Sequence, residues 1–164
     1  MRQVIEVRKR WPLRCLPPIA TACVFLLCAI APTKGQGPEV KVIEMEIGDN
    51  MRYAPSVIDA EPGQKLRVVL KPVGKIKALG HNFVLLKQGT EAKPFVDKAA
   101  DATEQTGDIP PAMRDQIIAE IPLVRSGNTG EVTFEAPAQR GEYDFVCTFP
   151  SHFKLGMKGR LIVK

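Results

Sequence analysis

Short runs of hydrophobic residues, most of them with a period of two, dominate the chain after residue 38. A period of two places every second side chain on one face of a β-strand, so each run predicts a strand with one buried face. The runs cover residues 40–47, 66–70, 83–86, 132–134, 143–147 and 158–163. Glycine and proline turns separate them. This spacing predicts an all-β fold, a Greek-key β-sandwich of antiparallel strands.

Two segments depart from the simple alternation. Between Val42 and Ile43 the apolar positions change phase, which predicts a β-bulge within a long strand. Residues 90–120 show helical spacing instead, and Pro111 can start a second short helix that reaches Ile118. We therefore expect a short helical flap inserted into a sandwich that forms one domain over residues 36–164.

Residues 1–35 differ in composition and predict a signal peptide. Basic residues around position 9 precede an apolar stretch over residues 19–31. That stretch is shorter than the roughly 20 residues that a membrane-spanning helix needs. We expect cleavage before Gln36 and export to the periplasm. The alternative is an uncleaved anchor that holds the domain at the periplasmic face of the membrane, and only in that case is the membrane a partner.

The basic charge of the chain is concentrated in this leading segment. The formal net charge is +5, from 23 Lys and Arg and 18 Asp and Glu. Six of the basic residues and one acidic residue lie in 1–35, which leaves 17 of each kind for 36–164. A domain close to neutral, without a basic patch, does not have the pattern of a nucleic-acid-binding protein.

Cys147 is the one cysteine of the expected mature domain, because Cys15, Cys23 and Cys28 lie in the leading segment. The domain therefore cannot form an internal disulfide. A lone thiol in an oxidising compartment is expected to be buried or used in chemistry. The alternation over 143–147 places Cys147 on the inward face at the end of a strand. A core cysteine and a metal thiolate remain the two interpretations.

Three further residues favour the metal thiolate. His152 and Met157 follow Cys147 on one loop, and His81 is the other histidine of the chain. Each alone is more often a core or surface residue, but the set is uncommon. Soft sulfur ligands suit Cu(I) and imidazole suits both oxidation states, whereas a thioether is a poor ligand for zinc, the main rival ion. The set predicts one copper ion in a type 1 (blue) site, with Met157 as a weak axial ligand.

Residues 79–85 (LGHNFVL) and 147–152 (CTFPSH) resemble the two copper-ligand segments of azurins. The resemblance extends over about 39–164. It implies a cupredoxin sandwich of about eight strands with a helical flap. It also implies a weak fifth contact to copper from the Gly80 carbonyl, and hydrogen bonds from Asn82 to the loop near Thr148 that orient the ligands.

Two features depart from azurins. Azurins place three residues between the second histidine and the methionine, whereas four separate His152 from Met157 here. This longer loop is similar to that of auracyanins, membrane-associated relatives from photosynthetic bacteria. Azurins also carry a disulfide that a domain with one cysteine cannot form.

The sequence thus predicts an electron-transfer protein rather than an enzyme. A copper oxidase or nitrite reductase needs more copper ions and many more histidines than the two of this chain. A periplasmic copper-binding or delivery protein without a redox role is the alternative. By the resemblance, redox proteins are the expected partners, docking transiently near His152 on an apolar patch that Leu79, Pro150, Phe153 and Leu155 can form. Burial in the core is the alternative for all four residues, and above all for Phe153 and Leu155.

Overall fold

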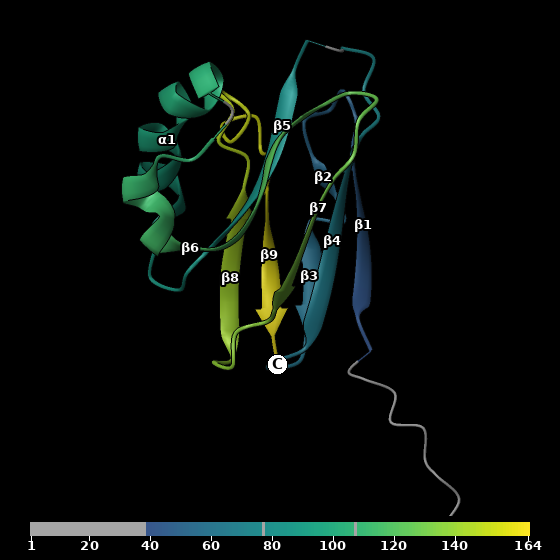
Figure 1. Cartoon of the computed structure of the whole chain (residues 1–164), viewed down its shortest axis with the longest axis vertical. Coiled ribbons are helices and arrows are strands. Elements are labelled where there is room, and N and C mark those ends of the chain that lie inside the picture. Colours follow the sequence, from purple (N-terminus) through teal and green to yellow (C-terminus); the bar gives the residue numbers. More distant parts are fainter. Residues whose placement is uncertain (1–38, 77, 107) are drawn as a thin grey trace, which may run out of the picture. The chain divides into compact units, whose positions relative to one another are not determined.

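The structure is a computed structural model that describes residues 39–76, 78–106 and 108–164 (Figure 1). The expected signal peptide lies outside these residues. The elements are β1 (Lys41–Ile47), β2 (Tyr53–Ala54), β3 (Val57–Ala60), β4 (Lys65–Pro72), β5 (Gly80–Leu86), α1 (Ala92–Thr106), the 3₁₀ helix η1 (Pro111–Gln116), β6 (Ile117–Arg125), β7 (Gly130–Glu135), β8 (Gly141–Val146) and β9 (Lys158–Val163). In the described part of the chain, no helix is long and apolar enough to cross a membrane.

The strands form two sheets that pack as a β-sandwich, as expected. One sheet has the order β2-β1-β4-β7 and the other β3-β9-β8-β5-β6. Most neighbouring strands are antiparallel, but β1 pairs with β4 and β3 pairs with β9 in parallel. The expectation of a purely antiparallel sandwich was therefore wrong at these two pairs. Between β1 and β4 the chain crosses to the other sheet at β3, and β4 re-enters the first sheet in the direction of β1.

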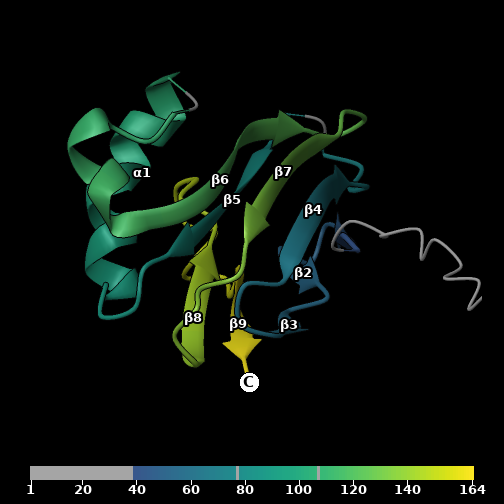
Figure 2. The ribbon, with the colours of Figure 1, turned by 60° about the horizontal axis from the view of Figure 1, so that its bottom comes forward.

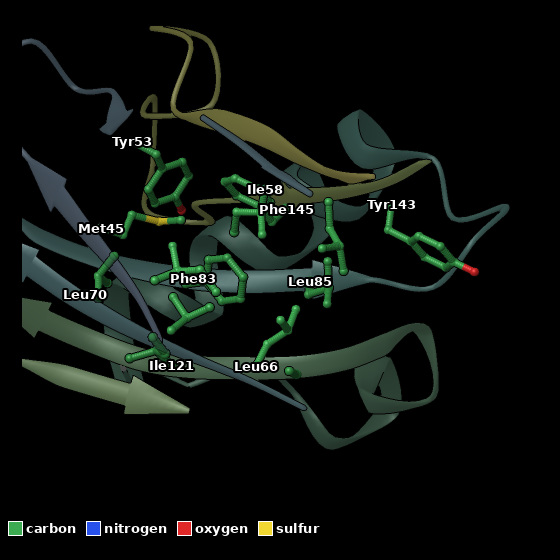
Figure 3. Close-up of a cluster of buried hydrophobic side chains, with 14 of the residues drawn as sticks. Met45, Tyr53, Ile58, Leu66, Leu70, Phe83, Leu85, Ile121, Tyr143 and Phe145 are labelled. Carbon is green, nitrogen blue, oxygen red and sulfur yellow. The ribbon is translucent and has the colours of Figure 1, made fainter. Parts of the chain in front are cut away.

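Aromatic rings fill the centre of the core between the two sheets (Figure 3). The rings of Phe83 and Phe145 lie 5.1 Å apart between centroids, and Tyr53 meets Phe145 edge-on at 5.3 Å. Offset and edge-on contacts of this kind stabilise aromatic pairs beyond the burial of their area. Tyr143, Phe145 and Cys147 all face this core, as the alternation of their strand predicted.

β5 is buried on both faces because α1 covers the outer side of the five-stranded sheet (Figure 2). Val84 and Leu86 point outward and pack with Phe95 and Ala99 of α1 in a second apolar cluster. A strand that is covered on both faces carries a continuous apolar run instead of an alternating one. This explains the run at 83–86, and it confirms the helical spacing read in the flap.

The expected bulge near Val42 is absent. β1 pairs with β4 in one uninterrupted register from Lys41 to Ile47. Val42 is 53% exposed, whereas Ile43 faces the core. The change of phase in the sequence therefore comes from a valine on the solvent face, and not from an inserted residue.

The flap ends at Gln116, and the following strand, β6, was missed in the sequence. The segment Ile117–Arg125 overlaps the flap expected over 90–120 and contains Pro122, which argues against a strand. β6 lies at the edge of its sheet, where a residue without an N–H donor is tolerated. The register between β5 and β6 shifts across this proline.

Candidate metal centre

Three residues with metal-binding side chains converge at one end of the sandwich. His81 is the second residue of β5, rather than part of a loop, and Cys147 directly follows the last residue of β8. His152 lies in the connection between β8 and β9. One potential ligand atom from each residue lies within 4.8 Å of the others, and all three residues are buried. The fold therefore brings His81 to the other two donors, as the sequence hypothesis requires.

Met157, the expected axial ligand, is held beside Cys147 by the backbone. The Cys147 N–H donates to the Met157 carbonyl at 3.2 Å, and the Met157 N–H donates to the His152 carbonyl at 2.9 Å. The side chain of Met157 is fully buried. Its thioether thus belongs to the same closed loop as two of the donors, and its role as a ligand stays a prediction.

The loop over residues 147–157, which we call the ligand loop, is compact. It is held by hydrogen bonds within the loop and by one from another connection. The Leu155 N–H donates to the Ser151 carbonyl at 3.0 Å. Gly156 has a φ of 97°, which side chains other than glycine rarely allow. From the β1–β2 connection, Arg52 Nη1 donates to the Gly156 carbonyl at 2.9 Å. The residue that precedes Met157 is therefore held by a second loop.

Burial controls the protonation of the three donors. It raises the pKa of the Cys147 thiol to about 11, although hydrogen bonds from the backbone of Asn82 and Phe149 oppose this rise. Burial lowers the pKa of His81, and burial together with the nearby His81 lowers the pKa of His152 to about 4. Without a metal ion, the thiol is protonated and both imidazoles are neutral at pH 7. A metal ion that binds the thiolate must displace a proton.

The donor atoms fit a copper ion. His81 Nδ1 is buried and has no hydrogen-bond partner in the described part of the chain. His152 Nδ1 lies 3.5 Å from Cys147 Sγ. A buried polar atom without a partner costs about 1–3 kcal/mol, and a metal ion at this position supplies the missing partner. Two imidazoles and one thiolate, with a thioether on the same loop, are the ligand types of a blue copper site.

Buried hydrogen bonds tie the strand that carries His81 to the loop that begins at Cys147. Asn82 Nδ2 donates to Thr148 Oγ1 at 2.8 Å, and the Thr148 N–H donates to Asn82 Oδ1 at 2.9 Å. The Tyr53 hydroxyl donates to the Asn82 carbonyl at 2.5 Å. Asn82 and Thr148 are therefore joined by two hydrogen bonds, and their role in orienting the ligands stays a prediction.

Thr103 of α1 extends this network, although no sequence pattern pointed to it. Its hydroxyl lies 2.7 Å from the Thr148 hydroxyl, and both residues are fully buried. The helical flap is thereby linked to the residue that follows Cys147. A single threonine among the polar residues of a helical segment carries no signal that it faces the site.

Replacing Thr103 by valine removes this hydroxyl and keeps the volume of the side chain. We expect Thr103→Val to lower the free energy of unfolding of the metal-free protein by about 1–2 kcal/mol, because the buried Thr148 hydroxyl loses a partner. Urea denaturation measures the change. The same substitution at Thr133, which is exposed on β7, is the control and should change stability by less than about 0.5 kcal/mol. Equal losses in the two variants would contradict the role given to Thr103.

Gly80 has a structural reason to lack a side chain. A Cβ at this position would overlap the side chain of Leu123 on the neighbouring strand β6. This packing accounts for glycine without any contact to a metal. The weak contact from the Gly80 carbonyl stays a prediction.

The four residues expected to form an apolar patch are not equally exposed. Leu155 is 54% exposed, which favours the surface interpretation for this residue. Phe153 is half-buried and packs against the cluster beneath α1, with Lys158 Nζ 5.1 Å from its ring centroid. Leu79 and Pro150 are half-buried. Of the two residues for which both core and surface were expected, Phe153 therefore contributes to the core and Leu155 to the surface.

Known proteins show the same sequence pattern and fold. Residues 39–164 match the model of the family described as copper binding proteins, plastocyanin/azurin family. Auracyanin-A of Chloroflexus aurantiacus is 32% identical over 132 residues, which cover 79% of this chain and 76% of the relative. The copper-resistant cuproprotein CopI of Rubrivivax gelatinosus is 31% identical over 126 residues, 76% of this chain and 67% of the relative. The solved structure of auracyanin A superposes with a TM-score of 0.67 at 31% identity, over 77% of this chain and 100% of that one.

Proposed function

This chain belongs to the plastocyanin/azurin family of copper-binding proteins, and from that premise we propose that it carries single electrons through one blue copper ion. The proposed ligands are His81, Cys147, His152 and Met157, with a weak contact from the Gly80 carbonyl. The observation that supports this proposal most directly is the convergence of three buried donors from β5 and the β8–β9 loop. When bound, copper supplies a reversible one-electron change between Cu(I) and Cu(II).

The protein's own residues keep the donors in one arrangement. Cys147 lies at the end of a strand, and Asn82 and Thr148 join its loop to β5 through two hydrogen bonds. Arg52 holds the loop just before Met157. A site fixed in this way moves little when the charge at its centre changes, so little free energy is spent on reorganisation. The burial of the donors also keeps water from the site.

Adding Cu(II) to the metal-free protein tests the proposal. We expect an intense blue absorption band, caused by charge transfer from the Cys147 thiolate, that disappears on reduction and returns on reoxidation. Coulometry should find one electron per copper. A colourless Cu(II) protein, or a band that does not respond to reductant, would overturn the proposal.

Delivery of copper is a second candidate, supported by the similarity to a copper-resistant cuproprotein. The buried donors argue against easy release of the ion. Competition with a Cu(I) chelator such as bathocuproine disulfonate distinguishes the two functions. Transfer of copper within seconds supports delivery, whereas retention over hours supports electron transfer.

Both histidines of the chain lie at this one site, so we propose no enzymatic role.

The thioether of Met157 can be tested separately. We expect Met157→Leu to keep copper and to raise the reduction potential by tens of millivolts, because a weak donor to Cu(II) is removed. Protein-film voltammetry measures the shift. Met45→Leu, a fully buried methionine on β1, is the matched control and should leave the potential in place. An unchanged potential in Met157→Leu would show that Met157 is not the axial ligand.

We also propose that the domain is exported to the periplasm and exchanges electrons there with redox proteins that dock near His152. The composition of residues 1–35 supports export. The mass of the purified protein decides between a cleaved signal peptide, which predicts a chain that begins at Gln36, and a retained membrane anchor.

A further inference from the structure

Four connections at the metal-binding end of the sandwich form one continuous surface. They are residues 48–52, 73–79 apart from 77, 126–129 and 150–157. Together with Arg125 at the end of β6 and Lys158 at the start of β9, we call them the metal-end face. Arg52 bonds to the Gly156 carbonyl, and the Lys75 N–H donates to Asp49 Oδ1 at 2.7 Å. Ser126 Oγ donates to the carbonyl of Gly74 at 2.6 Å. Each connection thus contacts the next, around the start of β5.

Three large hydrophobic side chains are exposed on this face. Leu155 is 54%, Ile76 52% and Val73 58% exposed, and these three residues are half of the large, exposed hydrophobic residues in the described part of the chain. Exposed apolar groups that gather on one face commonly mark a site of association. The three lie on two different connections, so they are separate apolar side chains on this face and not an extended apolar groove.

The same face is strongly cationic. Its exposed basic residues are Arg52, Lys75, Arg125, Lys154 and Lys158. None of them forms an ion pair with another described residue. The one acidic residue on these four connections is Asp49, whose Oδ1 accepts hydrogen bonds from the backbone of Lys75 and Ile76.

The charge is therefore distributed unevenly over a domain that is neutral as a whole. Residues 36–164 contain equal numbers of basic and acidic residues, yet five basic residues and one acidic residue lie on the metal-end face. The rest of the domain must then carry a net negative charge. This separation of charge gives the domain an electric dipole. During a diffusional encounter the dipole turns the metal-end face toward an acidic surface and away from a basic one.

We propose that the metal-end face docks a redox protein whose own docking surface is rich in carboxylates. This inference rests on the proposed electron transfer and adds the charge of the partner. Lysine and arginine on the same face as a few exposed apolar side chains provide fast, salt-dependent association with an acidic surface, and the limited apolar contact allows rapid dissociation. An anionic membrane would also attract the cations, but three separate apolar side chains offer little to insert into it.

Two double variants distinguish the effect of the cations on the metal-end face from the effect of the net charge of the whole protein. Lys75→Gln with Arg125→Gln removes two positive charges from the metal-end face. Lys65→Gln with Arg140→Gln removes two from the opposite end, because Lys65 starts β4 and Arg140 directly precedes β8. All four side chains are exposed, and neither variant changes a proposed ligand. Arg52 is left in place because it holds the ligand loop.

The copper-loaded, reduced protein is then oxidised by hexacyanoferrate(III), an anion, and by tris(phenanthroline)cobalt(III), a cation, in a stopped-flow instrument. We expect the rate with the anion to fall as ionic strength rises, and the rate with the cation to rise. At low ionic strength, the metal-end variant should react about threefold more slowly with the anion, whereas the control variant should stay close to the parent rate. Poly-L-glutamate, which presents carboxylates as an acidic protein does, should inhibit the reaction with the anion.

Several results would overturn the inference. Rates that do not depend on ionic strength, or equal losses in both double variants, would show that the local cations do not steer association. Binding of the copper-loaded protein to phosphatidylglycerol vesicles at physiological salt, lost in the metal-end variant, would assign the face to a membrane instead. Absence of oxidation by either complex would overturn the proposed electron transfer itself, and this inference with it. Oxidation without any dependence on charge would overturn the inference alone.

Discussion

Cys147→Ser should abolish the intense blue absorption of the copper-loaded protein completely. The band requires a thiolate bound to Cu(II), and a serine hydroxyl stays protonated at neutral pH and is a poor donor to copper. We expect the affinity for copper to fall by orders of magnitude as well, because the two imidazoles then act without an anionic donor. Visible absorption during titration with Cu(II) measures both effects.

Loss of the band must be separated from loss of the fold. The serine replaces a fully buried thiol, so a moderate decrease in stability is expected, by about 1–3 kcal/mol for a newly buried hydroxyl. The far-ultraviolet circular dichroism of the variant should still match that of the parent. Ser126→Ala, on a connection at the same end of the domain, is a control that should keep the full band. A folded Cys147→Ser protein that retained the blue band would overturn the assignment of the thiolate.

Phe145→Ala should have the largest effect on the stability of the fold. Phe145 is completely buried, contacts both Phe83 and Tyr53, and fills the space that Gly159 on β9 leaves open. Removing the ring loses its burial and leaves a cavity that two rigid sheets cannot close. The expected cost is about 3–5 kcal/mol in the free energy of unfolding. Urea denaturation of the metal-free protein measures it.

Phe153→Ala is the matched control for this prediction. Phe153 is half-buried on the outer side of the five-stranded sheet, where the structure can relax around the missing ring. We expect it to cost at least about 2 kcal/mol less than Phe145→Ala. Equal costs would show that the core between the sheets does not dominate stability.

The local structure of most strands could be predicted from the sequence because it depends on alternation alone. The period of two at 66–70 corresponds to β4, and the last strand, expected at 158–163, corresponds to β9. Helical spacing in the flap corresponds to α1. The bulge was predicted wrongly and β6 was missed, because the exposure of Val42 and the position of Pro122 on an edge strand depend on neighbouring strands.

The types of donor at the candidate site were also determined by the sequence. One cysteine, one methionine and a histidine lie within a single short loop, and chemistry alone makes copper the preferred ion for this set. These inferences need no knowledge of distances, because loop length limits how far apart the three residues can be.

Only the tertiary structure decided which distant groups join that loop. His81 reaches Cys147 because β5 and β8 are neighbours in one sheet, and Thr103 reaches Thr148 because α1 packs over that sheet. The gathering of unpaired cations on the metal-end face likewise depends on four connections that meet at one end of the sandwich. Alternation and side-chain chemistry are local properties that a sequence displays directly, whereas proximity across the sandwich follows from strand order, which no local pattern encodes.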